Sequence, residues 1–584
     1  MEANPRAAHS AASAYNGCWM SKRTGLVLFP LLAALFLVMN RGAYRGYFSD
    51  DEVDNLSWTP FVSGAAFARA LATPLFLEYN FRPVGHFYFH FMEQRFGLDF
   101  PKYVAAIHLF HLLNCWLLWM LARRLGAPPL AALAAVLFFA FHMALFDALW
   151  KPMYVFDVLC GTLCLASILF YTGGRWVLSF LAFWMAYKSK ELAVMLPAVL
   201  AAYEWWLGKR RWKPLVPFFA ASLSFGLQGI LLNPNRDNDY TFRFTPAALA
   251  RTSVYYAGRV FLVPFAGFAV LAAPFLARQR RAWFGLAMSG LFFVPLLFLP
   301  GRLFSAYCYV PFTGLAVAIS AADLTSVRAR AAAAVLFLLW FPWDYYQMRV
   351  ERRAKLAKDD EVRAWMTDLG RFAARSPETD SFVYAGAPAG FQHWGIEGAL
   401  KYFYRRNDLD IHFVGDPEAA QTMRKEKFAM LTWDARAKRL GIAAHTPGTR
   451  DVSYLAMNPG TPVWQLGDGW YDLEDTYRWL RPGATARLWR PVGARRFEVR
   501  VNIGQEQMQS VGVQEVTVTL DGTKLEPRRF PRLAWQTERW DVAPAPEGEV
   551  EVKFEVRPSF RPGNETRVLG LAVGGFGFLP EERP

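Results

Sequence analysis

The sequence predicts a polytopic α-helical membrane domain that is followed by two soluble modules, one α/β and one a β-sandwich. Of its 584 residues 54% are hydrophobic, with 50 Phe and 22 Trp, which is too apolar for an ordinary soluble protein. Long apolar runs dominate residues 24–346, whereas residues from 347 onward have a soluble composition. We therefore expect a cytoplasmic tail over 1–23, a membrane domain over 24–346, an α/β module over 347–449 and a β-sandwich over 450–584.

The apolar runs predict about eleven membrane spans, because crossing a bilayer takes roughly 20 apolar residues. The first run is followed by Asn40 and Arg41 without a small-residue cleavage pattern, so we interpret it as an uncleaved signal anchor. The expected spans are 24–40, 103–122, 128–146, 153–171, 176–187, 191–207, 214–232, 253–276, 283–300, 303–321 and 331–346.

Short basic clusters between these spans predict their orientation. The clusters at 209–213 and 278–281, like the other basic loops, fall on one side of the membrane if the N-terminus is cytoplasmic. An odd number of spans then places the C-terminal modules outside, on the same side as the segment that follows the first span. Because topology accounts for the formal net charge of +15, we expect no nucleic-acid partner.

An acidic segment follows the first span almost directly. It contains Asp50, Asp51, Glu52 and Asp54 within five residues. Carboxylates at a membrane face can act as a general base, bind a metal, bind a cationic ligand or belong to a solvated loop. Glu52 and Asp54 also suit the start of a helix, where negative charge is favourable.

Four cations fall near predicted external ends of spans, where a charged residue is a functional hypothesis by default. They are Arg82, Lys190, Arg243 and Arg302. The alternative for each is a side chain that snorkels to the lipid headgroups. Lys190 has a further alternative, an ion pair with Glu191 that fixes the entry of the following span.

Two pairs of histidines have the helical spacing of metal ligands, His86 with His90 and His108 with His111. No third ligand at suitable spacing follows either pair, although Glu93 lies near the first. We therefore predict aromatic packing and no metal site, with a divalent metal as the alternative.

The residues beyond the last span predict a small α/β module. Its expected helices are 359–375 and 395–405, and its expected strands are 381–386, 410–415 and 427–433. The expected order is helix, strand, helix, strand, strand.

From about residue 450 short alternating runs recur between turns, which is typical of a β-sandwich. Its tryptophans suit core packing and a scaffold role, with stacking on sugar rings as the alternative. They are Trp464, Trp470, Trp479, Trp489, Trp535 and Trp540.

Five motifs occur in order between residues 24 and 320. They are Asp50-Asp51; Phe81-Arg82-Pro83-Val84; His108–Asn114 with Arg123-Arg124; Ser189-Lys190-Glu191 with Pro197 and Tyr203-Glu204; and Tyr307-Cys308-Tyr309-Val310-Pro311. Together they resemble the C-type glycosyltransferase superfamily, whose polytopic members take a sugar from a polyprenyl-phosphate carrier at the external membrane face. The closest likeness is to protein O-mannosyltransferases, particularly those with tetratricopeptide repeats and their bacterial relatives.

The sequence also departs from that pattern. The family's His-Pro corresponds to His142-Met143, its following Glu to Asp147 and a downstream Asp to Asp157. The Glu-Arg that precedes Tyr-x-Tyr is replaced by Ser305-Ala306, which leaves Arg302 as the nearest cation. Tetratricopeptide repeats are absent from the sequence, so the resemblance does not extend to a protein acceptor.

The resemblance implies a C-type fold and a glycosyltransferase that moves a monosaccharide from a polyprenyl-phosphate donor to an acceptor hydroxyl, with inversion. Asp50 or Asp51 is then the base, and the four cations are candidates for holding the donor phosphate. Candidates for lining the site are Glu52, Asp147, Asp157, Glu191 and Tyr307. For Asp147 and Asp157, packing against a polar neighbour is an equal alternative.

The identity of the sugar stays open, and the acceptor is a protein, a lipid or a polysaccharide. The family likeness and the compact loops favour a bacterial inner membrane with the C-terminal modules in the periplasm. Two non-catalytic alternatives remain: a membrane protein that binds or moves a lipid-linked glycan, and a structural component of the envelope.

Overall fold

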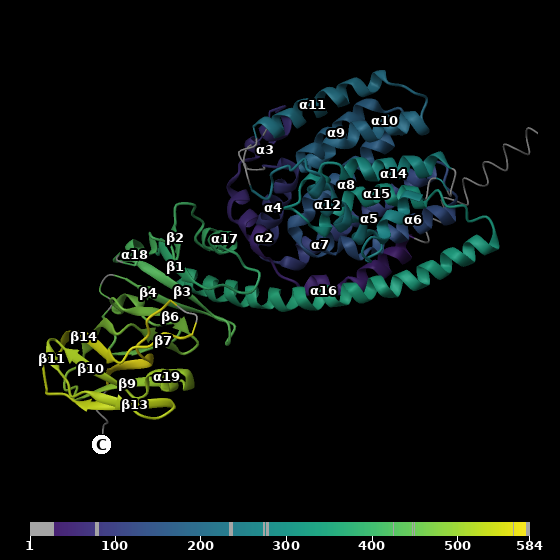
Figure 1. The fold of residues 1–584 in the computed structure, drawn as a ribbon. Helices are drawn as coiled ribbons and strands as arrows, with labels where there is room; N and C mark the ends of the chain where they lie inside the picture. The colour runs from purple at the N-terminus through teal and green to yellow at the C-terminus, as the bar shows by residue number, and fades with distance from the viewer. Residues whose placement is uncertain are drawn as a thin grey trace, which may run out of the picture. The chain divides into compact units, whose positions relative to one another are not determined.

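The computed structural model of the chain describes residues 29–75, 77, 81–232, 238–272, 275, 279–423, 425–446, 448, 450–563 and 566–579. The chain divides into two compact units, Met1–Asp359 and Asp360–Pro584. Figure 1 shows that the first is helical and that the strands belong to the second. The expected cytoplasmic tail over 1–23 and the start of the first expected span lie outside the described residues.

The first unit is helical, and several of its described helices are long and apolar enough to cross a membrane. By length and composition, four of the described helices can cross a membrane: Phe100–Arg124, Pro152–Thr172, Lys213–Leu231 and Arg280–Phe298. The count rises to five if Pro129–Phe141 and Met143–Trp150, which meet at a bend of 47°, form one span. The expected count of eleven is not confirmed.

Interruptions between helices explain part of this difference. The expected spans 176–187 and 191–207 correspond to α9 (Trp176–Ser189) and α10 (Leu196–Trp206), with the short 3-10 helix Glu191–Met195 between them. Both are shorter than the roughly 20 residues that a straight crossing needs.

Inside the membrane domain, α8 packs against α5 and α9, and α15 packs against α14 and α6. An apolar helix, Phe29–Met39, precedes the acidic segment. The helices of this unit not yet given a label and bounds are α2 (Asp50–Trp58), α3 (Gly64–Ala72), α4 (Pro83–Phe96), α5 (Phe100–Arg124), α6 (Pro129–Phe141), α7 (Phe146–Trp150), α8 (Val155–Thr172), α11 (Val216–Leu231), α12 (Pro246–Val260), α14 (Arg280–Phe293) and α15 (Tyr309–Ile319).

The acidic segment forms the first turns of α2. Ser49 is the N-cap and Glu52 the third helical residue, so that the two form a capping box. The Glu52 carboxylate accepts hydrogen bonds from the Ser49 backbone N at 3.0 Å and from Ser49 Oγ at 2.8 Å. The helix-start interpretation of Glu52 and Asp54 is confirmed, and the solvated-loop alternative is wrong for Glu52, which is buried.

One long helix, α16 (Val327–Arg375), contains both the expected last span, 331–346, and the expected helix 359–375. The intervening residues 349–358 are almost all strong helix formers, chiefly Arg, Ala, Lys and Glu, so nothing in them ends the helix. The expected boundary at 346/347 therefore falls inside α16.

The second unit begins with the predicted α/β module. Its sheet has the order β2-β1-β3-β4, in which β1 is parallel to β2 and β3, and β4 is antiparallel to β3. The predicted strands and the helix at 395–405 are confirmed. The elements are β1 (Ser381–Ala385), α17 (His393–Tyr404), β2 (Asp410–Phe413), α18 (Ala419–Thr422), β3 (Phe428–Asp434) and β4 (Arg439–His445).

The β-sandwich follows as predicted, with strand orders β11-β10-β14-β8 and β13-β9-β15-β7-β6; β12 pairs with β10 and β5 with β15. Both sheets contribute to one buried core, for example through Phe554 of β14 and Phe576 of β15. The elements are β5 (Tyr454–Ala456), β6 (Trp470–Glu474), β7 (Tyr477–Leu480), β8 (Gly483–Arg490), β9 (Arg496–Ile503), α19 (Gln505–Val511), β10 (Gln514–Leu520), β11 (Thr523–Lys524), β12 (Arg528–Phe530), β13 (Ala534–Asp541), β14 (Gly548–Arg557) and β15 (Ala572–Phe578).

The tryptophans of this region differ in their surroundings. Trp540 is buried in the sandwich core, whereas Trp464 packs against the core of the α/β module. Trp535 is partly exposed. Core packing is confirmed for Trp540, and sugar stacking by the exposed rings stays a prediction.

Candidate active site

A cavity of about 680 Å³ in the membrane domain is lined by six of the eleven site candidates named from the sequence. Its walls come from α2, the start of α4, the start of α8, the turn after α9 and two loops near residues 240 and 302. The candidates among its lining residues are Asp51, Arg82, Asp157, Lys190, Arg302 and Tyr307.

One face of α2 forms the acidic wall of this cavity. Asp51, Asp54, Asn55 and Trp58 all line it, and the last three lie three, four and seven residues after Asp51 along the helix. Such spacing places side chains on a single helix face. Asp50, the first residue of α2, is not among the lining residues. Asp51 is therefore the carboxylate of the predicted pair that faces the cavity.

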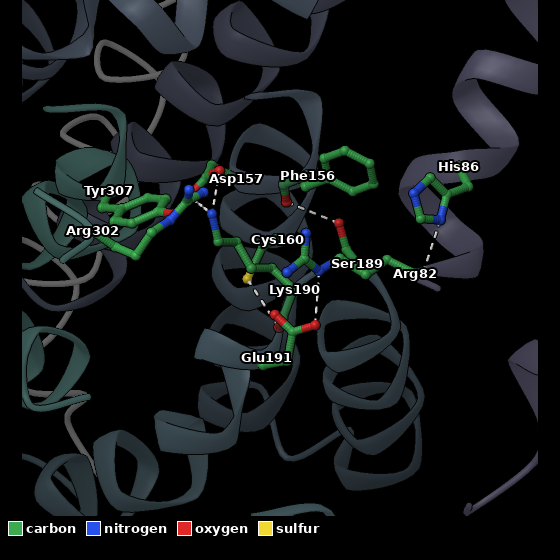
Figure 2. A network of polar contacts seen from close by, with 10 residues as sticks. All are labelled: Arg82, His86, Phe156, Asp157, Cys160, Ser189, Lys190, Glu191, Arg302 and Tyr307. Carbon is green, nitrogen blue, oxygen red and sulfur yellow. Dashed lines mark hydrogen bonds and ion pairs between the residues drawn. The ribbon is translucent and has the colours of Figure 1, made fainter. Parts of the chain in front are cut away.

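Asp157 and Lys190 form a buried ion pair in the cavity wall. Lys190 Nζ donates to both carboxylate oxygens of Asp157, at 2.7 and 2.6 Å, and the side chains are only 11% and 2% exposed (Figure 2). Lys190 Nζ also lies 4.2 Å from the centroid of the Tyr307 ring. The first turn of α8 and the turn after α9 are thereby joined at the cavity.

The alternative that Lys190 pairs with Glu191 is wrong. Lys190 has an extended backbone, so its side chain and that of Glu191 point to opposite sides. Lys190 reaches Asp157, while Glu191 Oε1 accepts from Arg82 Nε at 2.7 Å. Glu191 itself does not line the cavity.

Arg82 stands at the N-terminus of α4, with its guanidinium against Glu191 and 5.4 Å from the centroid of the Phe156 ring. Burial alone would lower the pKa of Arg82, but the Glu191 carboxylate reverses this and raises it, so the side chain is a permanent cation. Burial and the charge of Arg82 lower the pKa of His86 to about 3. His86 is thus neutral at pH 7, and its Nδ1 accepts a hydrogen bond from the Arg82 backbone N at 2.9 Å.

Arg302 is held by aromatic rings instead of a carboxylate. Its guanidinium carbon lies 4.3 Å from the centroid of the Tyr240 ring and 4.5 Å from that of Phe304. One guanidinium nitrogen donates to Tyr307 Oη at 3.3 Å. Among the described residues, none of its contacts is an ion pair with a carboxylate, so its charge is available to a ligand.

Three further candidates lie away from the cavity. Asp147 pairs with Lys151 at 2.8 Å and lines a separate space of about 170 Å³. Arg243 lines another cavity beside Arg251. Glu52 of α2 is buried and does not line the cavity, and its carboxylate also accepts from the Met153 backbone N at 3.2 Å.

The predicted histidine pairs each have other partners. His90 Nδ1 contacts the carbonyl oxygen of Thr59, and both ring nitrogens of His108 and of His111 have hydrogen-bond partners. His86 and Phe81 stack at a ring-centroid distance of 5.4 Å, as expected of aromatic packing. Within the described ranges no group of three or more His, Cys, Asp or Glu has the geometry of a metal site.

Several aromatic cavity residues were not assigned to the site from the sequence. They are Trp58, Phe81, His86, Tyr154 and Tyr240. Phe81 was named only as part of the motif that contains Arg82, and His86 only as one of a possible metal pair. Trp58, Tyr154 and Tyr240 are ordinary aromatics in a chain that contains 50 Phe, 22 Trp and 23 Tyr.

The chain has distant structural likenesses, but no protein-family model and no curated protein matches it in sequence. Arabinofuranosyltransferase AftD from Mycobacteria is 13% identical with a TM-score of 0.44, over 94% of this chain and 60% of AftD. ArnT from Cupriavidus metallidurans bound to undecaprenyl phosphate is 14% identical with a TM-score of 0.45, over 72% of this chain and 98% of ArnT. Neither name is that of an O-mannosyltransferase, so that narrower likeness rests on motifs alone.

Proposed function

We propose that this protein is a membrane glycosyltransferase of the C-type fold that transfers a monosaccharide from a polyprenyl-phosphate donor to an acceptor hydroxyl. The observation that carries the proposal is a single cavity in which the carboxylate of Asp51 faces the cations Arg82, Lys190 and Arg302. A base for a hydroxyl proton and positive charge for a leaving phosphate are the two requirements of this reaction.

The proposed chemistry is one displacement at the anomeric carbon. Asp51 accepts the proton of the acceptor hydroxyl while that oxygen bonds to the anomeric carbon. The bond from this carbon to the phosphate oxygen breaks, and the lipid phosphate leaves with the electron pair. Attack from the side opposite the phosphate inverts the anomeric centre.

The cations have different parts in this proposal. Arg302 is the first contact of the donor phosphate, because rings rather than a carboxylate hold its guanidinium. Lys190 and Arg82 are already paired with Asp157 and Glu191 and set the shape and charge of the wall. Guanidinium and ammonium groups supply the positive charge, and the proposal assigns no metal.

The size of the cavity and the aromatic side chains that line it suit a sugar. About 680 Å³ is within the range of small-ligand sites, and it has room for a monosaccharide with its phosphate. Trp58, Phe81 and neutral His86 offer ring faces against which the C–H groups of a sugar ring can pack. We place the cavity at the external face of a bacterial inner membrane, with an acceptor that is a protein, a lipid or a polysaccharide.

The alternative is a membrane protein that binds or moves a lipid-linked glycan without chemistry. A cavity that held such a glycan would present the same cations and rings. Only covalent transfer to a new acceptor separates the two functions.

The test is sugar transfer in membranes that contain the wild-type protein and a radiolabelled lipid extract of known donor activity. We expect label to leave the donor lipid and to appear in one separated pool of protein, lipid or polymer. Membranes that lack the protein provide the background. Label that stays on the donor lipid, or only changes membrane side, would contradict the proposal and favour the alternative.

A further inference from the structure

A buried ion pair on α16 contacts the backbone just before the acidic segment. Lys355 Nζ lies 2.6 Å from Asp359 Oδ2, one helical turn away, and the two side chains are 8% and 4% exposed. Lys355 also stands 5.6 Å from the centroid of the Phe100 ring. Neither residue lines the cavity, and the mechanism proposed above does not use them.

The same carboxylate oxygen holds a residue 312 positions earlier in the chain. Asp359 Oδ2 accepts the hydrogen bond of the Tyr47 backbone N at 2.9 Å. The approach is tight, because a Cβ on Gly46 would lie 2.9 Å from both Asp359 Oδ2 and Phe100 Cε1. A longer side chain at 46 would push this backbone away from its acceptor.

The residues between this hydrogen bond and Asp51 have little freedom to move. Phe48 is fully buried, with ring centroids 5.0 Å from Phe100 and 4.9 Å from Tyr103. Ser49 is then fixed as the N-cap of α2 by its two hydrogen bonds to Glu52. Burial raises the pKa of Glu52, and the positive charge of Lys355 opposes that effect, so the pair on α16 acts on both ends of residues 47–52.

A buried ion pair is a weak source of stability, because both charges lose their hydration. Its value here is geometric, since one oxygen of the pair is the acceptor for a backbone group next to the proposed base. Catalytic groups must be held within about 0.5 Å of their productive positions, and a displacement of 1 Å can cost about 100-fold in rate.

We propose that Asp359, held by Lys355, is a positioning residue that fixes the approach of the chain to α2 and thereby sets the place of Asp51 in the cavity. This inference rests on the proposed transfer reaction for its effect on rate. Its structural part, the restraint on residues 46–50, stands independently of that reaction.

The test compares Asp359→Ala, Asp359→Asn and Lys355→Met with Asp360→Ala, whose side chain is exposed on the same helix. Asp359→Ala removes the acceptor for Tyr47 N, whereas Asp359→Asn keeps an oxygen at that position. We expect kcat for sugar transfer to fall about 10- to 100-fold in Asp359→Ala, with KM for the donor within threefold of wild type. Asp359→Asn restores at least part of this loss, Lys355→Met has a smaller effect, and Asp360→Ala has none.

Hydrogen exchange provides the readout that is independent of catalysis. Peptides covering 44–52 exchange faster in Asp359→Ala than in wild type, while peptides from α8 keep their rate. Unchanged exchange over 44–52, or equal losses in Asp359→Ala and Asp360→Ala, would overturn the inference. If Asp359→Ala does not fold, the same comparison is made with Lys355→Met, for which unchanged exchange and rate overturn it. Faster exchange over 44–52 in Asp359→Ala, combined with a wild-type protein that never transfers sugar, would refute the proposed function alone.

Discussion

The cavity holds its cations in two different ways. Lys190 and Arg82 are each paired with a carboxylate, Asp157 and Glu191, whereas Arg302 packs against two aromatic rings. A paired cation is largely neutralised before a ligand arrives, and removing it leaves its carboxylate without a partner. A cation held by rings keeps its charge for the ligand. The comparison indicates that the first two shape the site and that the third meets the phosphate.

The largest expected effect is on stability, in Lys190→Met. This change leaves Asp157 buried without its cation, which costs about 3–5 kcal/mol of unfolding free energy in such pairs. Replacing both partners, in Lys190→Met with Asp157→Leu, should restore most of that stability because no charge is then buried. Thermal unfolding in detergent measures the stability of both variants. If Lys190→Met alone were as stable as wild type, the ion pair would not stabilise the fold.

Arg302→Gln should leave stability nearly unchanged and reduce sugar transfer about 100-fold, because the charge that stabilises the leaving phosphate is lost. The matched control is Arg259→Gln, since Arg259 also packs over a tyrosine ring, 4.6 Å from the centroid of Tyr255, but does not line the cavity. Initial rates at equal protein level give the comparison. A similar loss of transfer in both variants would contradict the assignment of Arg302 to the donor phosphate.

Glu191→Gln breaks the more exposed pair, in which Arg82 and Glu191 are 22% and 47% exposed. We expect at most about 1 kcal/mol of destabilisation, because solvent screens such a pair. Arg82 stays charged, although its pKa falls toward the ordinary value once the carboxylate is gone. Thermal unfolding of Glu191→Gln and Lys190→Met, measured side by side, tests whether Glu191→Gln is the less destabilised variant. An equal loss of stability in the two variants would contradict this prediction.

The smallest effect is expected for Arg243→Gln. Arg243 was a candidate for the donor phosphate, but it lines a different cavity from Asp51. Transfer should stay within about twofold of wild type under the assay used for Arg302→Gln. A loss as large as that of Arg302→Gln would mean that the donor extends into the second cavity.

Local patterns predicted much of the second unit. The strands of the α/β module were visible as short apolar runs, and those of the sandwich as runs that alternate with a period of two. The span count was not, since apolarity alone does not reveal that a run such as 128–146 is divided by a bend, here of 47° between Pro129–Phe141 and Met143–Trp150.

The motifs predicted which residues approach the cavity, but not their partners. Arg82 and Glu191 are 109 positions apart, and Asp359 and Tyr47 are 312 positions apart, so tertiary packing alone brings them together. The choice of Asp51 over Asp50 likewise depends on the face that α2 turns toward the cavity. A sequence in which both residues are Asp does not contain that information.

The assignment of Asp51 as the base is tested most directly by measuring donor binding and sugar transfer in Asp51→Asn, side by side with Asp50→Asn. We expect Asp51→Asn to bind the labelled donor within about threefold of wild type and to lose transfer by about 1,000-fold, within the range of a general base. Asp50→Asn should retain both. Undiminished transfer by Asp51→Asn, or the same loss confined to Asp50→Asn, would contradict the assignment of Asp51 as the base.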